Sequence, residues 1–335
     1  MTAGHDGAVT LGELLRGAAA AWPEAVFVRI GAGNDLPPAL RLGVLDALAD
    51  HYAARLAETA LPEASRVLLL GASEPRTLAA IVGISRAGFD VALAPPALDA
   101  RSIAAAAEAC GASVLAGPAA FAELRTGKRL FEAAALSDAI TLVALHGPAE
   151  AGAFALDAPR EGSAPVEAPT REGGLFTVDV LDATPRCRAI SQARAGDIAR
   201  DYLARVQFAA GEPIVSILSL ASEAGLVGGA FAPLMGGAHM IWQAPFAARR
   251  FLETLQTSAP AHLFAPAGMA SELGAAEIAT ADLLSSLTLA TAVGVPAPLF
   301  AHGLDPARIF LLRAGESSDL SLERLHDWPA RTPAQ

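Results

Sequence analysis

Short, continuous runs of apolar residues alternate with longer amphipathic stretches in the first third of the chain. Apolar runs occupy positions 66–70, 90–94 and 113–116, and the stretches 75–87 and 103–110 lie between them. Continuous apolar runs of this length are typical of strands buried on both faces of a parallel sheet. The longer stretches have the length and spacing of helices. The β-α-β-α-β order therefore predicts a parallel sheet with helices on both faces.

The pattern continues to the end of the chain and predicts an α/β fold with two lobes. Residues 149–170 are rich in Ala, Pro, Gly and Glu, which indicates a linker or surface loop. We therefore predict a first lobe over residues 1–150, a linker or loop over 151–172 and a second lobe over 173–335. The same criteria predict further helices at 11–21, 40–61, 195–207 and 247–258, and further strands at 26–30, 175–180, 214–220, 239–243, 261–265, 287–292 and 309–312.

One apolar stretch is long enough to cross a bilayer. Residues 224–248 contain no Asp, Glu, Lys or Arg. Several glycines and prolines interrupt this stretch, which favours a buried helix, a turn and a buried strand. We therefore expect no membrane span. The interrupting residues are Gly225, Gly228, Gly229, Pro233, Gly236, Gly237 and Pro245.

The charge and the cysteine content of the chain indicate which partners and which cellular compartment to expect. The formal net charge is -11, and an acidic surface repels phosphate backbones, so we expect no nucleic-acid partner. The two cysteines, Cys110 and Cys187, form neither a CxxC motif nor a metal-binding spacing. No apolar run follows Met1, so no signal peptide is predicted. These features indicate a reduced, cytoplasmic protein without a metal cluster.

Three colinear groups of segments resemble the adenylate-forming superfamily, which includes the acyl-CoA synthetases. The first contains Val82-Gly-Ile-Ser-Arg-Ala-Gly88, similar to the family's G-I-x-R-A-G, after the strand 66–70 and before the strand 90–94. The second, residues 216–226 with 233–238, resembles L-P-L-F-H-x-x-G-L followed by P-L-x-x-G-A. The third, residues 261–269, resembles T-H-L-x-x-x-P-x-x. The resemblance covers residues 10–318 and implies the two-lobed N-terminal domain of these enzymes.

The resemblance implies ATP·Mg²⁺ and CoA as cofactors and a carboxylate as substrate, but the phosphate loop departs from the family pattern. The family's T-S-G-T-T-G-x-P-K-G corresponds here to residues 176–187, which keep Thr184, replace the lysine with Arg186 and contain no glycine. Asp179 and Asp182 bring negative charge instead. Each would oppose a nearby triphosphate by roughly 1–4 kcal/mol. Alternatively, the two aspartates could hold Mg²⁺.

Other family motifs are also altered. The aromatic-His pair becomes Ala221-Ser222, the adenine-side turn G-G-A-P-L becomes residues 295–299, and Y-G-x-T-E keeps only Glu316. The competing interpretations are a solvated loop arginine for Arg186, a buried small residue for Ser222 and a capping or surface glutamate for Glu316. The ligand-binding candidates that the resemblance implies are Thr184, Arg186, Ser222, Gly225, Pro298 and Glu316.

Three further residues have chemistry of their own. We expect His239 and His262, in apolar runs, to be core histidines with hydrogen-bond partners. Cys187 lies between Arg186 and Arg188, which should lower its pKa if it is exposed and would suit a redox or nucleophilic role. No catalytic residue is predicted.

Three functions are consistent with the sequence. The family's C-terminal domain carries a catalytic lysine, but this chain ends at Gln335, and its single lysine, Lys128, lies in a predicted surface helix. The first hypothesis is a degenerate homologue, a pseudoenzyme, that binds an acyl, carboxylate or nucleotide-like ligand or a protein partner. The second is an acyl-CoA ligase or acyl-transfer subunit completed by a separate C-terminal domain. The third is a scaffolding subunit that forms a homo-oligomer through an exposed apolar patch and has a filled crevice.

Overall fold

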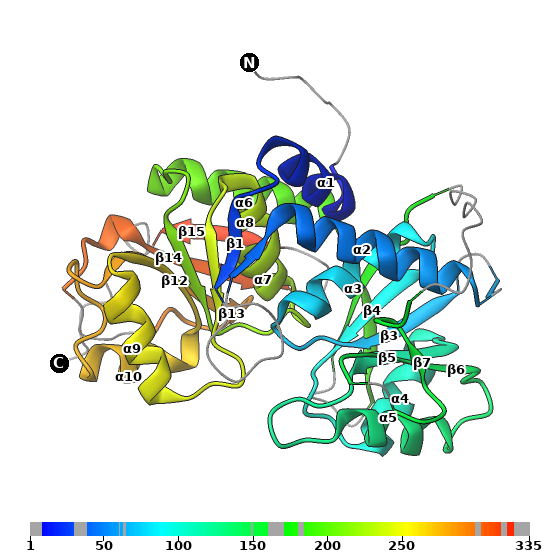
Figure 1. The fold of residues 1–335 in the computed structure, drawn as a ribbon. Coiled ribbons are helices and arrows are strands. Elements are labelled where there is room, and N and C mark those ends of the chain that lie inside the picture. The colour runs from blue at the N-terminus through cyan, green and yellow to red at the C-terminus, as the bar shows by residue number, and fades with distance from the viewer. Residues whose placement is uncertain are drawn as a thin grey trace.

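The computed structural model describes residues 9–29, 39–59, 61–62, 65–148, 150–159, 171–179, 184–298, 303–315 and 320–324. Within these residues the strands form two mostly parallel sheets, and helices pack on both faces of each sheet (Figure 1). The predicted α/β fold class is therefore confirmed. Among the described residues, no helix is both long enough and apolar enough to cross a membrane.

The smaller sheet has seven strands in the order β7-β6-β5-β3-β4-β8-β9. Its neighbouring strands are parallel except for β8 and β9, which pair antiparallel at one edge. Its strands are β3 (Arg66–Leu70), β4 (Asp90–Ala94), β5 (Val114–Pro118), β6 (Leu142–His146), β7 (Phe154–Ala155), β8 (Leu175–Asp179) and β9 (Arg186–Ile190).

The larger sheet has eight strands in the order β15-β14-β13-β12-β10-β11-β1-β2. Its central strands are parallel, and β2 and β15 close its two edges antiparallel to their neighbours. Its strands are β1 (Val26–Arg29), β2 (Ala39–Arg41), β10 (Pro213–Ser216), β11 (His239–Trp242), β12 (Ala261–Pro266), β13 (Leu284–Ala292), β14 (Ile309–Ala314) and β15 (Ser321–Arg324).

A central layer of helices joins the two sheets. The largest core cluster contains Leu69 of the smaller sheet and Phe264 of the larger sheet, together with helices of this layer. These helices are α1 (Leu11–Ala21), α2 (Leu42–Ala57), α3 (Pro75–Arg86), α6 (Gln192–Val206), α7 (Glu223–Leu226), the π-helix η1 (Val227–Phe231) and α8 (Ala232–Gly236).

Two outer layers complete the fold. Consecutive side chains of β3 lie on opposite faces of the smaller sheet. Leu68 packs against α4 and α5, whereas Leu69 packs in the central core. On the larger sheet, α9 and α10 cover the face opposite the central helices. These outer helices are α4 (Ala100–Cys110), α5 (Thr126–Ala134), α9 (Ala248–Ser258) and α10 (Ala270–Ala275).

The sheets do not follow the predicted division of the chain into lobes 1–150 and 173–335. β8 and β9 lie in the predicted second lobe, yet β8 pairs with β4 in the smaller sheet. β1 and β2 lie in the predicted first lobe, yet β1 pairs with β11 in the larger sheet. A local hydrophobic pattern identifies a strand but does not identify its partner.

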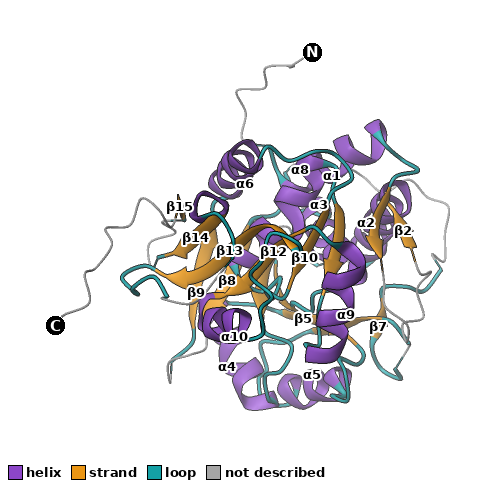
Figure 2. Ribbon diagram, turned by 90° about the vertical axis from the view of Figure 1, so that its left-hand side faces the viewer, coloured by secondary structure: helices purple, strands orange, loops and turns teal. Residues whose placement is uncertain are grey.

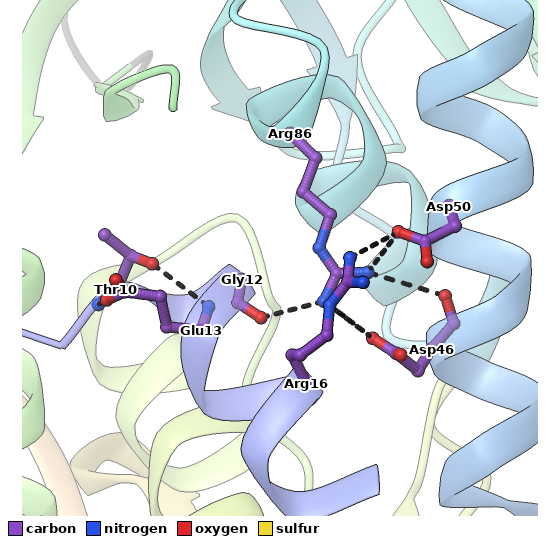
Figure 3. A network of polar contacts seen from close by, with 7 residues as sticks. All are labelled: Thr10, Gly12, Glu13, Arg16, Asp46, Asp50 and Arg86. Carbon is purple, nitrogen blue, oxygen red and sulfur yellow. Dashed lines mark hydrogen bonds and ion pairs between the residues drawn. The ribbon is translucent and has the colours of Figure 1, made fainter. Parts of the chain in front are cut away.

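A buried arginine in the G-I-x-R-A-G-like motif ties three helices of the central layer together (Figure 3). The Arg86 side chain is 7% exposed and lies at the end of α3. Its guanidinium donates to the Gly12 carbonyl of α1 at 2.8 Å and to carboxylates of α2, Asp46 at 2.6 Å and Asp50 at 2.8 Å. Arg16 of α1 also contacts Asp50 at 2.6 Å. The motif therefore has a structural role in docking α1 against α2 and α3.

Replacing Arg86 with alanine should lower the free energy of unfolding by about 3 kcal/mol, because it removes the nearest cation from the largely buried Asp46 carboxylate. The matched control is Arg249→Ala, whose side chain is 92% exposed and pairs with Glu253 on α9. That change should cost less than about 1 kcal/mol. Urea denaturation followed by tryptophan fluorescence measures both, and equal losses would show that the buried network does not stabilise the fold.

Candidate functional site

Two loops from different sheets dock against each other and position the candidate site. The turn after β3 meets the loop between β10 and α7. Ser73 Oγ donates to the Leu218 carbonyl at 3.0 Å and accepts from the Leu220 amide at 3.1 Å. Ser219 Oγ donates to the Gly71 carbonyl at 3.2 Å. We call this contact the loop joint, formed by residues 71–73 and 218–221.

The loop joint leads directly into a short helix that faces the smaller sheet. Thr177 Oγ1 on β8 donates to the Ala221 carbonyl at 2.8 Å. Ser222 then caps α7, and its hydroxyl accepts from the Gly225 amide at 3.0 Å and donates to the Ser219 carbonyl at 2.9 Å. The first turn of α7 is thereby fixed opposite the β8–β9 hairpin.

A cavity of about 1210 Å³ lies between these elements. It is bounded by the β8–β9 hairpin, the start of α7, the end of α4 and the carboxyl ends of β13 and β14. Ligands of α/β proteins usually bind at this end of parallel strands. The lining residues are Ala105, Glu108, Ala109, Thr177, Asp179, Thr184, Pro185, Arg186, Cys187, Arg188, Ser222, Glu223, Ala224, Ala290, Thr291, Ala292, Ala314 and Gly315.

The cavity combines small apolar walls with charges of both signs. Its carboxylates belong to Glu108, Asp179 and Glu223, and its guanidinium groups belong to Arg186 and Arg188. Arg188 is held in place because its Nη1 donates to the Gly315 carbonyl at 2.5 Å. Arg186 is exposed. The remaining wall consists of small residues, with alanine the most frequent, which leaves room for an apolar ligand group.

Glu223 is the buried acid of the cavity. The residue is 5% exposed, and its Oε2 has no hydrogen-bond partner among the described residues. Burial raises the pKa of Glu223, and the nearby charge of Arg188 opposes that rise. A buried carboxyl oxygen without a partner is unfavourable.

The structure brings together half of the predicted ligand-binding residues. Thr184, Arg186 and Ser222 line the cavity, although the Ser222 hydroxyl is engaged in capping α7. Gly225 and Pro298 do not line it. A Cβ at Gly225 would lie 1.7 Å from the Ser219 carbonyl oxygen, so this glycine permits close packing of the loop joint. Glu316 and Asp182 lie outside the described residues.

Sequence reasoning missed Glu223, for which the chain carried a signal. Glu223 is the single Asp, Glu, Lys or Arg between positions 213 and 248. An isolated charge in a long apolar stretch must either reach solvent or lie in a polar site. His262 agrees with its prediction: it is 1% exposed, and its ring nitrogens lie 2.9 Å from Ser286 Oγ and 3.2 Å from Glu212 Oε2.

Comparisons with known proteins identify the fold. No family model matches the sequence, and neither does any curated protein. The structure is similar to MbtA from Mycobacterium smegmatis, with a TM-score of 0.75, 17% identity and coverage of 96% of this chain and 60% of MbtA. It is similar to the N-terminal domain of FACL13 from Mycobacterium tuberculosis (TM-score 0.69, 16% identity, coverage 95% and 79%). It is also similar to the anthranilate CoA ligase AuaEII in complex with anthranoyl-AMP (TM-score 0.68, 14% identity, coverage 91% and 58%).

These similarities confirm, for the fold, the resemblance seen in the sequence. The chain has the fold of the N-terminal domain of adenylate-forming enzymes. It spans 60% of the length of MbtA, and identities this low establish the fold alone.

Replacing Gly71 with alanine should disturb the loop joint. The added Cβ would lie 2.9 Å from Ala221 Cβ and 3.0 Å from Ala221 N, so one loop must move. We expect a loss of about 1–3 kcal/mol of stability. The matched control is Gly17→Ala on α1, where an added Cβ meets nothing within 4 Å. This substitution should raise the free energy of unfolding by up to about 1 kcal/mol, because alanine favours the helix more than glycine does. Urea denaturation measures both; an unchanged Gly71→Ala protein would contradict a tight joint.

Proposed function

We propose that the chain binds an acyl or carboxylate ligand in the cavity between the β8–β9 hairpin and α7, and that it does not ligate carboxylates to CoA by itself. The observation that carries this proposal is the charge of the cavity wall. Asp179, at the position of the family's phosphate loop, lines the cavity together with Glu108 and Glu223. The described part of the wall thus contains three carboxylates and two guanidinium groups.

This wall does not fit the triphosphate of ATP. Phosphate loops hold phosphates with glycine backbone amides and a lysine, and residues 176–187 contain neither glycine nor lysine. A carboxylate a few ångströms from a phosphate opposes binding by roughly 1–4 kcal/mol. Among the described residues, no group of three His, Cys, Asp or Glu side chains is placed to hold a metal ion.

The same wall suits a smaller anion with a donor group. Arg186 and Arg188 can receive a carboxylate through paired N–H donors, which match its geometry. The carboxyl group of Glu223 also lines the cavity and can accept from an N–H or O–H of the same ligand. Alanines of α4, α7, β13 and β14 leave space for the acyl or aromatic part.

Two other functions make different predictions. An active ligase or acyl-transfer subunit, completed by a separate C-terminal domain, requires that ATP·Mg²⁺ binds; the fold it shares with AuaEII supports this alternative. A scaffolding homo-oligomer requires a filled crevice, and the open cavity of about 1210 Å³ argues against it. A nucleotide-like ligand or a protein partner would be a variant of the first proposal.

A thermal-shift panel distinguishes these functions. The purified protein is tested with ATP·Mg²⁺, AMP, CoA and a set of aromatic and fatty carboxylates. A carboxylate at 100 times its Kd should stabilise the folded state by about 2.7 kcal/mol and raise the melting temperature visibly. ATP·Mg²⁺ should produce no shift. A shift with ATP·Mg²⁺ would contradict the proposal and favour the two-part ligase, and no shift with any compound would favour the scaffold.

The Arg186→Gln variant then tests the site of binding. Loss of the paired donors should weaken the affinity for the carboxylate about tenfold, or about 1.4 kcal/mol. The control is Arg249→Gln on α9, which is remote from the cavity and should leave the affinity unchanged. Equal affinities in both variants would place the ligand elsewhere.

A further inference from the structure

The fold brings the two cysteines of the chain together. Cys110 is the last residue of α4, and Cys187 is the second residue of β9, an edge strand that packs beside α4 (Figure 2). Cys187 packs against the same hydrophobic cluster that contains Cys110, and the Cys110 thiol donates to the Ala107 carbonyl at 3.5 Å. Cys110 is 3% exposed in the core beneath α4, whereas Cys187 is half-buried and lines the cavity. Cys187 thus borders the cavity, and Cys110 lies in the core against which Cys187 packs.

An arginine of the neighbouring strand holds a positive charge beside the pair. Arg66, the first residue of β3, donates through Nη1 to the Cys110 carbonyl at 2.6 Å, and its charge acts on the Cys187 thiol. Its guanidinium lies 3.9 Å from the centre of the Phe176 ring, and its Nη2 lies 3.2 Å from Asp90 Oδ2. These contacts fix the guanidinium in a partly buried position, where a charge is poorly screened.

The surroundings make the two thiols unequal. The neighbouring Cys110 thiol and then the charge of Arg66 lower the pKa of Cys187, burial opposes them, and the net pKa is about 7. The pKa of Cys110 is raised, first by its interaction with the Cys187 sulfur and then by burial. The sequence predicts a lowered pKa at Cys187, but the groups responsible are Cys110 and Arg66 and not the expected Arg186 and Arg188.

We propose that Cys187 and Cys110 are a reactive pair, in which Cys187 reacts with hydroperoxides that enter the cavity and Cys110 resolves the product. The Cys187 thiolate attacks one peroxide oxygen, the O–O bond breaks, and a sulfenic acid forms. The other oxygen takes up a proton equivalent to the one that the Cys187 thiol released on ionising, and leaves as water or an alcohol. The Cys110 thiol then attacks the Cys187 sulfur. Its proton and the sulfenic hydroxyl leave as water, and an S–S bond forms. The two cysteines supply two electrons, and the peroxide is reduced.

The site differs from an ordinary surface thiol in three ways. It contains a second thiol packed in the same cluster as the first, a fixed cation beside Cys110, and an open cavity bordered by Cys187. The resulting disulfide would join α4 to β9, the strand that presents Arg186 and Arg188 to the cavity. The pair therefore adds a modification site to the same wall that the proposed ligand would contact, and its chemistry does not require that ligand.

Intact-mass spectrometry tests this pair in the full chain. The reduced wild-type protein, treated with hydrogen peroxide, should lose about 2 Da by forming the disulfide. In the Cys110→Ser variant, Cys187 should instead form a sulfenic acid that dimedone traps. In the Cys187→Ser variant, neither product should form. Persistence of two free thiols in the wild type, or dimedone labelling at Cys110 in place of Cys187, would overturn the proposal.

The pH dependence of alkylation tests the role of Arg66 separately. The rate of iodoacetamide reaction at Cys187 in Cys110→Ser should be compared with that in the Cys110→Ser/Arg66→Gln double variant. Loss of the cation should slow the reaction at pH 7 about fivefold and shift its pH midpoint upward, because less thiolate is present. Adding Arg249→Gln instead should leave the rate unchanged. Equal rates with and without Arg66 would show that the cation does not activate Cys187.

Discussion

The loop joint between residues 71–73 and 218–221 is the constraint on which the candidate site depends. Each sheet is built locally, but the cavity has walls from both, so its shape is set where the two sheets touch. Ser73 satisfies a carbonyl and an amide of the opposite loop, and Gly71 lets that loop approach to van der Waals contact. The next residues, Ser222 and Glu223, are consequently held opposite the β8–β9 hairpin. In the helix layer between the two sheets, the buried Arg86 network docks α1 against α2 and α3.

The cavity formed in this way keeps the shape of a ligand site while its charges differ from those a triphosphate requires. Backbone amides and a lysine usually neutralise phosphates. Here the corresponding wall holds Asp179, Arg186 and Arg188, with the buried Glu223 facing them. Paired guanidinium groups next to a buried acid are suited to a ligand that is both an anion and a hydrogen-bond donor. The alanine walls add apolar surface without filling the space.

The local pattern of apolar residues was sufficient to predict the bounds of several helices and strands. For example, α1, β3 and β4 begin and end where the sequence predicts. The assignment of strands to sheets was not predictable, because β8 and β9 follow the loop yet pair with the earlier sheet. The same limit applies to the site. The motif positions of Thr184, Arg186 and Ser222 identify the cavity wall, whereas Glu223 requires knowledge of burial, and the proximity of Cys110 to Cys187 requires the packing of α4 on β9. Residues that are distant in sequence meet only through tertiary packing.

A crystal structure of the protein soaked with a mixture of ATP·Mg²⁺ and the carboxylates tests most directly which ligand the cavity binds. We expect a carboxylate in the cavity, with its oxygens on Arg186 and Arg188, a donor group toward Glu223 and no triphosphate beside Asp179. A triphosphate bound along the β8–β9 hairpin would contradict it, as would a carboxylate bound only outside the cavity. Either contrary result would mean that the charged residues of the cavity wall do not determine which ligand binds in the cavity.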